Sequence, residues 1–221
     1  SIRAELTVTE RTGMARYTFS SKEKQGTVII GGGVAATSIQ VAAIKITGPH
    51  SCEGYAEGGA FCGIPTPYKV YFVAEFDADA ESFGTWKEER LHANHTFAEG
   101  SHSGVYFTFP LKEGNQAVQY KIGVSYVSVE NARENLRVEN PAWDFSAVRQ
   151  ATQDKWNEYL GKIEVEGDNE DRQMQFYTHL YRSLIHPNVC SDVNGEYMGA
   201  DSQVHKTARK FYSSFSNWDT Y

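Results

Sequence analysis

The sequence predicts a β domain followed by a helical segment, and two periodicities carry this prediction. Up to about residue 127, apolar side chains recur at every second position, as in Tyr120, Ile122, Val124 and Tyr126. A period of two is typical of a half-buried strand. From about residue 128 the apolar period lengthens to three or four residues, as in a helix with one apolar face. The change predicts a β domain, a helical linker and the start of a helical domain.

The β domain is predicted to begin with two strands between residues 3 and 20, around a turn at residues 11–13. Further strands are predicted at residues 28–30, 38–47, 68–76, 105–109 and 118–127. The triple glycine at residues 31–33 has the composition of a phosphate loop. However, no Lys-Ser or Lys-Thr pair follows it and no helical pattern starts there, so a hairpin or bulge is favoured.

Two stretches of the β domain are predicted to lack strands. Residues 54–67 are rich in glycine and proline and contain Phe61 and Cys62. A long irregular loop in a compact domain is commonly functional, but composition leaves ligand contact and a simple sheet corner equally open. Residues 77–103 are polar. Their histidines have no metal-ligand spacing and are expected to be solvated.

Three helices are predicted after residue 128. The first covers residues 129–136. Asp144 caps a second, which closes at residues 160–161, and either Asp168 or Asn169 caps a third, which Pro187 ends. Beyond it, residues 192–196 faintly resemble a calcium loop without its ligand spacing. We interpret Asn194-Gly195 as a tight turn joining two short strands.

Composition excludes several classes of function. The net charge of −7 argues against nucleic acid, because no basic stripe is present to neutralise phosphates. There is no run of roughly 18 apolar residues to span a membrane.

No signal peptide opens the chain, which starts inside an alternating pattern, so one could precede it. Cys52 and Cys62 could pair, but reduced thiols are favoured for this odd count of cysteines.

Residues 211–221 combine aromatic rings, hydroxyl groups and one carboxylate, Asp219. A sugar stacks its C–H face on an aromatic ring and donates hydroxyl hydrogen bonds to a carboxylate, so this composition suits a sugar platform. For any single ring taken alone, a place in the core or on the sheet surface is favoured. A terminus usually consists of polar residues, so ending on Trp-Asp-Thr-Tyr indicates a piece of a longer polypeptide.

Five blocks of sequence together resemble the glycoside hydrolase family 92 α-mannosidases. The similarity covers most of the chain and keeps the family's order, in residues 59–63, 125–136, 176–182, 191–197 and 215–221. It implies a calcium-dependent, inverting exo-α-mannosidase, of the α-1,2 type, that acts on mannose-containing glycans. The implied fold is a β-sandwich (supersandwich) domain, helical linkers and an (α/α)6 barrel, with the active site between sandwich and barrel.

The resemblance also divides the chain. Residues 1–128 correspond to the sandwich, incomplete at its N-terminus, residues 129–166 to the helical linker, and residues 167–221 to the start of the catalytic barrel. The remainder of the polypeptide is therefore an expected partner. The apolar helix faces after residue 144 would be covered by a complete barrel, so we expect the chain alone to self-associate.

Substrate-binding roles follow from the resemblance for four residues: Phe61, Cys62, Trp218 and Asp219. The chemistry agrees, because an aromatic ring suits the apolar edge of a sugar and a carboxylate can accept two hydroxyl protons.

The general acid, the general base and the calcium ligands of the family are expected beyond residue 221. For this reason Glu53, Glu57 and Asp192 receive no catalytic role.

The leading hypothesis is that the chain is part of a secreted or periplasmic bacterial mannosidase and is inactive alone. The alternative is a non-catalytic carbohydrate-binding β-sandwich module. A purely structural scaffold is a third hypothesis, but it leaves the composition of residues 211–221 unexplained.

Overall fold

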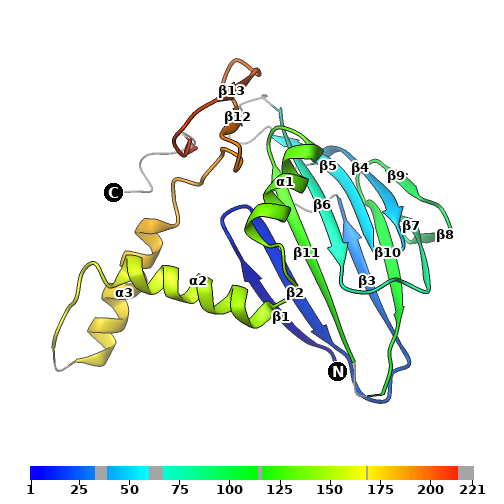
Figure 1. Ribbon diagram of the computed structural model, residues 1–221, viewed down its shortest axis with the longest axis horizontal. Helices are drawn as coiled ribbons and strands as arrows, with labels where there is room; N and C mark the ends of the chain where they lie inside the picture. The colour runs from blue at the N-terminus through cyan, green and yellow to red at the C-terminus, as the bar shows by residue number, and fades with distance from the viewer. Residues whose placement is uncertain (33–38, 60–66, 114–115, 168, 214–221) are drawn as a thin grey trace.

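The structure is a computed structural model that describes residues 1–32, 39–59, 67–113, 116–167 and 169–213. Three helices follow a series of strands (Figure 1). The strands are β1 (Arg3–Val8), β2 (Thr12–Thr18), β3 (Gln25–Gly31), β4 (Ile39–Gly48), β5 (Ser51–Gly59), β6 (Pro67–Phe76), β7 (Ser82–Lys87), β8 (Arg90–Ala93), β9 (Phe97–Glu99), β10 (Ser103–Pro110), β11 (Ala117–Ser125), β12 (Glu196–Met198) and β13 (Val204–Lys206). The helices are α1 (Val129–Glu139), α2 (Phe145–Leu160) and α3 (Glu170–Leu184).

Two antiparallel sheets form the β domain. The larger has the order β1-β2-β11-β6-β5-β4-β9 and the smaller β3-β10-β7-β8, while β12 and β13 make a separate hairpin. The apolar residues of alternating strands face one another between the two sheets, which is the arrangement of a sandwich core. Ile44 from the larger sheet and Phe107 from the smaller are completely buried there. The ring of Phe76 lies 4.9 Å from that of Phe107.

Helix α1 covers the opposite face of the larger sheet. Ser128 caps it by accepting a hydrogen bond from Asn131 N, and Leu136 packs with Val73 of β6. Gly123 of β11 lies directly beneath it, and a Cβ at this position would come within 2.3 Å of the carbonyl oxygen of Ala132. The absence of a side chain at residue 123 therefore lets α1 pack closely on the sheet.

Helix α2 lies against the edge strand β1, and α3 lies farther from the sandwich (Figure 1). Their predicted caps are confirmed: the Asp144 side chain accepts from Ala147 N, and that of Asn169 accepts from Arg172 N. Only Phe145 is buried among the residues of α2, and the described part of α3 buries none. Within the described residues, no helix combines the length and apolar character needed to cross a membrane.

Three sequence predictions are wrong in detail. Residues 54–59 belong to β5 rather than to an irregular loop. Packing requires glycine at position 54, because a Cβ there would lie 2.2 Å from the Ala43 carbonyl oxygen. The polar residues 77–103 contain β7, β8 and β9. The turn at Asn194-Gly195 exists but precedes β12, so it does not join the two short strands.

Candidate functional site

The four residues to which the sequence assigns sugar contacts, Phe61, Cys62, Trp218 and Asp219, lie outside the described residues, so their roles stay predictions. The structure describes the residues on either side of them. Residues 60–66 connect Gly59 at the end of β5 to Pro67 at the start of β6, and these two are register partners. Residues 214–221 follow Ser213.

Ser213 ends a short antiparallel pairing between residues 188–191 and 211–213, which we call the C-terminal ribbon. Ser213 N donates to the Asn188 carbonyl at 2.8 Å, and Cys190 N donates to the Phe211 carbonyl at 2.8 Å. Phe211 N in turn donates to the Ser191 hydroxyl at 2.9 Å. The backbone that leads to residues 214–221 is therefore held by residues 188–191.

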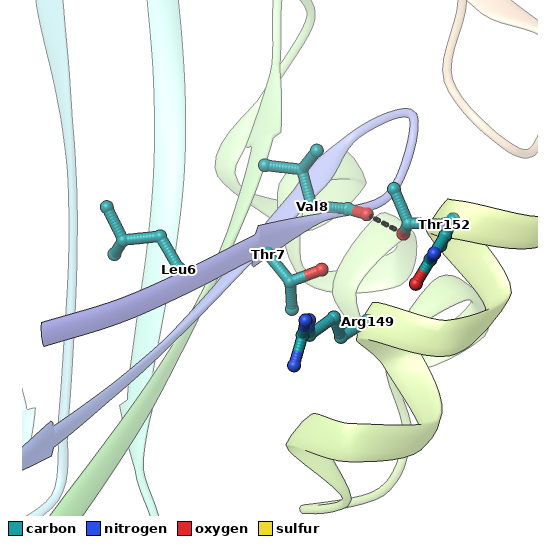
Figure 2. A pocket seen from close by; sticks show the side chains of 6 residues that line it. Leu6, Thr7, Val8, Arg149 and Thr152 are labelled. Carbon is teal, nitrogen blue, oxygen red and sulfur yellow. Dashed lines mark hydrogen bonds between the residues drawn. The ribbon is translucent and has the colours of Figure 1, made fainter. Parts of the chain in front are cut away.

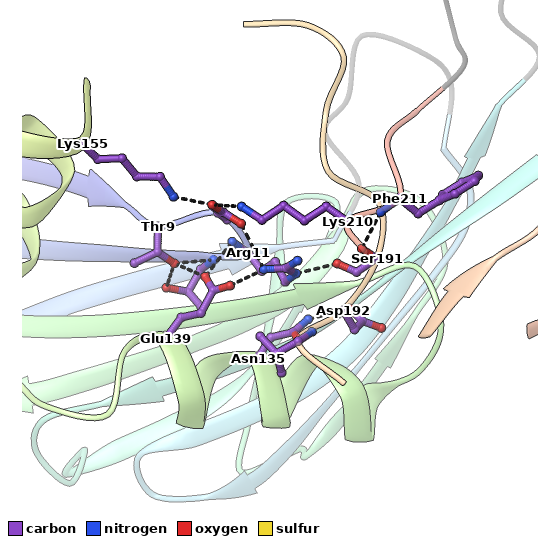
Figure 3. A network of polar contacts seen from close by, with 12 residues as sticks. Thr9, Arg11, Asn135, Glu139, Lys155, Ser191, Asp192, Lys210 and Phe211 are labelled. Carbon is purple, nitrogen blue, oxygen red and sulfur yellow. Dashed lines mark hydrogen bonds and ion pairs between the residues drawn. The ribbon is translucent and has the colours of Figure 1, made fainter. Parts of the chain in front are cut away.

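Asp192, which follows the ribbon, connects it to the sandwich (Figure 3). Its carboxylate is buried, with 4% of the residue exposed. It accepts hydrogen bonds from Ser125 Oγ at 2.7 Å, Asn131 Nδ2 at 2.8 Å and Asn135 Nδ2 at 2.6 Å. Ser125 ends β11, and both asparagines lie on α1.

Arg11, in the turn between β1 and β2, makes a second connection to the ribbon. Its Nε donates to the carbonyl of Ser191 at 2.5 Å, and its Nη1 donates to Glu139 Oε1 at 2.6 Å. The second carboxylate oxygen of Glu139 accepts from Arg11 N at 2.9 Å and from the Thr9 hydroxyl. Glu139 therefore orients the guanidinium towards the ribbon.

Glu10, beside Arg11, forms ion pairs with Lys155 of α2 and with Lys210, just before the ribbon's second half. Burial raises the pKa of this carboxyl, but hydrogen bonds from Lys155 and Lys210 outweigh that effect and lower the pKa to about 2. Ion pairs thus join the turn between β1 and β2 both to α2 and to the segment that leads into the second half of the ribbon (Figure 3).

A cleft of about 970 Å³ lies between the sandwich, α2 and the ribbon. Aromatic side chains from three different elements line it, namely those of Tyr126, Trp156, Tyr159 and Tyr212. Burial raises the pKa of Tyr126, and the neighbouring Cys190 and Tyr68 raise it further. The end of β11 pairs with Tyr71 of β6 and lines the cleft together with the ribbon, so it lies between the two strands of chain from which the predicted sugar-binding segments depart.

A second, smaller hollow of about 390 Å³ marks where α2 rests on β1 (Figure 2). Leu6, Thr7 and Val8 form one side and Arg149 and Thr152 the other. The Thr152 hydroxyl donates to the Val8 carbonyl. This hollow contains no carboxylate, and its contacts explain how the edge strand supports the helix.

The carboxylates that the sequence left without a catalytic role are engaged in contacts that stabilise the fold. Glu53 pairs with Arg133 of α1, and Glu57 pairs with Lys69 at 3.1 Å. Both oxygens of Asp192 accept N–H or O–H donors. Among the described residues, no group of three or more His, Cys, Asp and Glu side chains could hold a metal ion.

Sequence reasoning missed the role of Asn131, Asn135 and Arg11. The two asparagines, four positions apart on α1, carried a usable signal, because polar residues at that spacing share one helix face. Asn135 is completely buried, and such a burial requires hydrogen-bond partners. The identity of the partner, Asp192, was beyond reach because it lies 57 positions away.

Known protein families and structures match this arrangement. The model of the glycosyl hydrolase family 92 N-terminal domain matches residues 1–125, and the model of that family's catalytic domain matches residues 131–221. The comparison with curated proteins gave no match.

Three solved structures illustrate the similarity. The family GH92 α-mannosidase BT3965 from Bacteroides thetaiotaomicron is 24% identical, with a TM-score of 0.86, over 99% of this chain and 30% of that one. It has also been solved in complex with mannoimidazole. The GH92 family glycosyl hydrolase ccman5 is 26% identical, with a TM-score of 0.85, over 98% of this chain and 29% of that one. The family GH92 inverting mannosidase BT2199 from Bacteroides thetaiotaomicron VPI-5482 is 22% identical, with a TM-score of 0.80, over 96% of this chain and 28% of that one.

The chain spans about 30% of the length of these structures. Its β domain corresponds to the family's N-terminal domain, and the residues from α1 onward correspond to the start of its catalytic domain. Because the N-terminal-domain model alone matches more than half of the sequence, the chain belongs to glycoside hydrolase family 92.

Proposed function

We propose that this chain is part of a calcium-dependent, inverting exo-α-mannosidase of the α-1,2 type that releases terminal mannose from glycans. The observation that carries the proposal is the succession of the family's N-terminal and catalytic domains along the chain. The mannosidases among the solved structures, one of them an inverting enzyme, support it. A secreted or periplasmic location in a bacterium is part of the same proposal.

In this proposal the chain supplies two walls of the mannose pocket. Phe61 and Cys62 follow β5, and Trp218 and Asp219 follow the C-terminal ribbon. The location of the cleft supports this division, because Tyr126 and Cys190 of the ribbon both line it and the preceding residue, Ser125, is the register partner of Tyr71 in β6. Phe61 and Trp218 would pack on the apolar face of the sugar, while Asp219 would accept hydrogen bonds from its hydroxyls.

The catalytic step requires groups from elsewhere in the polypeptide. Inversion uses a general acid and a general base about 6.5–9.5 Å apart, with a water between them. Glu53, Glu57, Glu139 and Asp192 are all occupied by cations or hydrogen-bond donors. We place the calcium ligands in the rest of the protein, as the resemblance to the family implies.

Hydrolysis of an aryl α-mannoside tests the proposal. The polypeptide extended through its complete catalytic domain should release the aryl group, lose activity in EDTA and recover it on addition of calcium. The 221-residue chain should show no turnover. Turnover by this chain alone would show that its own carboxylates are catalytic, and an extended protein inactive on α-mannosides would overturn the assignment of substrate.

Calorimetry with mannose distinguishes the enzyme from the carbohydrate-binding module. If the isolated chain bound mannose at micromolar strength, the module would be favoured. The enzyme proposal expects little or no heat of binding, because most of the pocket and the calcium ion are then missing.

A further inference from the structure

Asp192 does more than close a turn, because every side chain that donates to its carboxylate belongs to another element. Ser125 Oγ and Asn131 Nδ2 both donate to Oδ2, and Asn135 Nδ2 donates to Oδ1. All four residues are at least nine-tenths buried. Hydrogen bonds to an ionised acceptor are about twice as strong as neutral ones, and low local polarity strengthens them further.

The contacts are reciprocal, which fixes orientation as well as position. Asn135 donates to Asp192 and accepts from Val193 N at 2.9 Å, so its amide engages two successive residues. Asn131 also donates to Glu196 Oε2 at 2.9 Å. Residues 192–196, which follow the first half of the ribbon, are therefore held by one face of α1.

The same contacts connect the two segments to which sugar contacts are assigned. Ser125 is the register partner of Tyr71 in β6, the strand that starts at Pro67. On the other side, Ser191 is adjacent to Asp192, and its hydroxyl accepts from Phe211 N in the ribbon that ends at Ser213. The two segments are thus connected by a path that follows β6 from Pro67 to Tyr71, crosses by sheet pairing to Ser125 and by a hydrogen bond to Asp192, and reaches Ser213 through the ribbon.

We propose that Asp192, with Ser125, Asn131 and Asn135, is a positioning clamp that sets the separation between Pro67 and Ser213, and hence between the two walls of the mannose pocket. Asp192 acts through the ribbon and touches no substrate. The clamp itself stands on the contacts above, while its consequence for mannose binding rests on the proposed function.

Hydrogen exchange on the 221-residue chain tests the clamp without any sugar. In Asp192→Asn, the new amide N–H₂ group would face the N–H₂ group of either Asn131 or Asn135, whichever way the side chain is turned. We expect amides in residues 188–196 and 211–213 to exchange about tenfold faster or more, with those of β4, β5 and β6 unchanged. Unchanged exchange in the ribbon would overturn the proposal.

Two further variants make the result specific. Asp201→Asn is the matched control, because Asp201 bonds only within the hairpin, to His205 and Gln203 N, and ribbon exchange should stay at the wild-type rate. Ser125→Ala removes one donor and leaves the charge in place, so a smaller acceleration confined to the same amides is expected. Acceleration spread over both sheets in Ser125→Ala would show that the cluster supports the sandwich as a whole, which would refute a positioning role.

The consequence for the sugar is measured in the polypeptide extended through its catalytic domain. Asp192→Asn should raise KM for an aryl α-mannoside by about tenfold with a smaller change in kcat, while Asp201→Asn leaves both unchanged. An unaltered KM together with faster ribbon exchange would refute the link between clamp and pocket. If the wild-type extended protein hydrolyses no mannoside, the proposed function fails, and the exchange result still decides whether the clamp exists.

Discussion

Lys121 shows at the scale of one residue how a buried charge can be accommodated. Its ammonium group donates to the carbonyls of Asn140 at 3.0 Å and Pro141 at 3.4 Å, and lies 4.1 Å from the centre of the Trp143 ring. Burial lowers the pKa of this lysine. The contacts with two carbonyls and an aromatic face offset the lost hydration and fix the connection between α1 and α2.

Replacing Lys121 by methionine should destabilise the fold by about 2 kcal/mol, because the stem remains but the buried Asn140 carbonyl and the partly buried Pro141 carbonyl lose their donor. Urea unfolding followed by circular dichroism measures the effect. Lys112→Met is the control, since Lys112 is exposed and its substitution should change stability by less than about 0.5 kcal/mol. Equal stability of the two variants would contradict the role given to the ammonium group.

Asp219 carries the prediction that belongs to the proposed pocket. In the polypeptide with its complete catalytic domain, Asp219→Ala should lower kcat/KM for an α-mannoside by about tenfold to a hundredfold, since a carboxylate that accepts sugar hydroxyls is lost. Asp201→Ala, on the exposed β12–β13 hairpin, should leave kcat/KM unchanged. Comparable losses in both variants would show that the effect is not specific to the pocket.

Residue-level prediction from the sequence succeeded where the partner is local. Asp144 was predicted as a cap, and Asn169 as one of two candidates beside Asp168, because a cap bonds only three positions along the chain. Asp192 could be placed in a turn but not in its cluster, because its donors lie 57 to 67 positions away. The structure shows where the backbone lies next to the two predicted sugar-binding segments, at Gly59, Pro67 and Ser213. The side-chain roles of Phe61, Cys62, Trp218 and Asp219 stay predictions.

At the scale of elements, the ion pairs of Glu10 join the β1–β2 turn to α2 and to the start of the ribbon. Its pKa is about 2 in the fold, against an ordinary value of 4.5 for a glutamate carboxyl. A carboxyl with a lowered pKa stabilises the folded state above about pH 4.5, and this contribution is lost as the pH falls towards 2.

Glu10→Gln should therefore be less stable than the wild type at neutral pH, by about 1–2 kcal/mol once solvent screening is allowed for. The difference should shrink between pH 4.5 and pH 2, as the wild type is protonated. Thermal unfolding across this pH range provides the measurement. A difference independent of pH would assign the effect to packing rather than to charge. Glu23→Gln, at an exposed position, controls for the change in net charge.

Alternation predicted the long strands well because their inner and outer faces differ in polarity. It failed for β5 because glycines replace the expected side chains where strands approach closely, as at Gly54. It also failed for β7, β8 and β9, which are short and polar. In β8, for example, Arg90 and Leu91 are both exposed, so no alternation of burial marks the strand.

At the scale of the whole molecule, the helices present apolar side chains that the described residues do not cover. Met174 is 65% exposed, and Tyr159, Tyr181, Leu184 and Ile185 are each 39–47% exposed. These residues come from α2, α3 and the residue after α3. An apolar surface of this kind marks a contact with further protein.

The 221-residue chain should therefore self-associate at micromolar concentrations, as analytical ultracentrifugation would reveal. The double variant Met174→Glu/Leu184→Glu should shift it towards the monomer. Leu91→Glu is a matched control, because Leu91 is 68% exposed but lies on β8, far from these helices in the fold (Figure 1). A monomeric wild type would contradict the expectation.

The pairing of Glu10 with Lys210 also has a consequence for how the chain is made. The two residues are 200 positions apart, so at about 5–20 residues per second the ribosome adds Lys210 roughly 10–40 s after Glu10. Glu139 is added well before Ser191, so Arg11 can be oriented by α1 while its second partner is still unmade. The sandwich and α1 can thus form their contact surface before the later segments are made, and this order of synthesis favours correct packing of those segments.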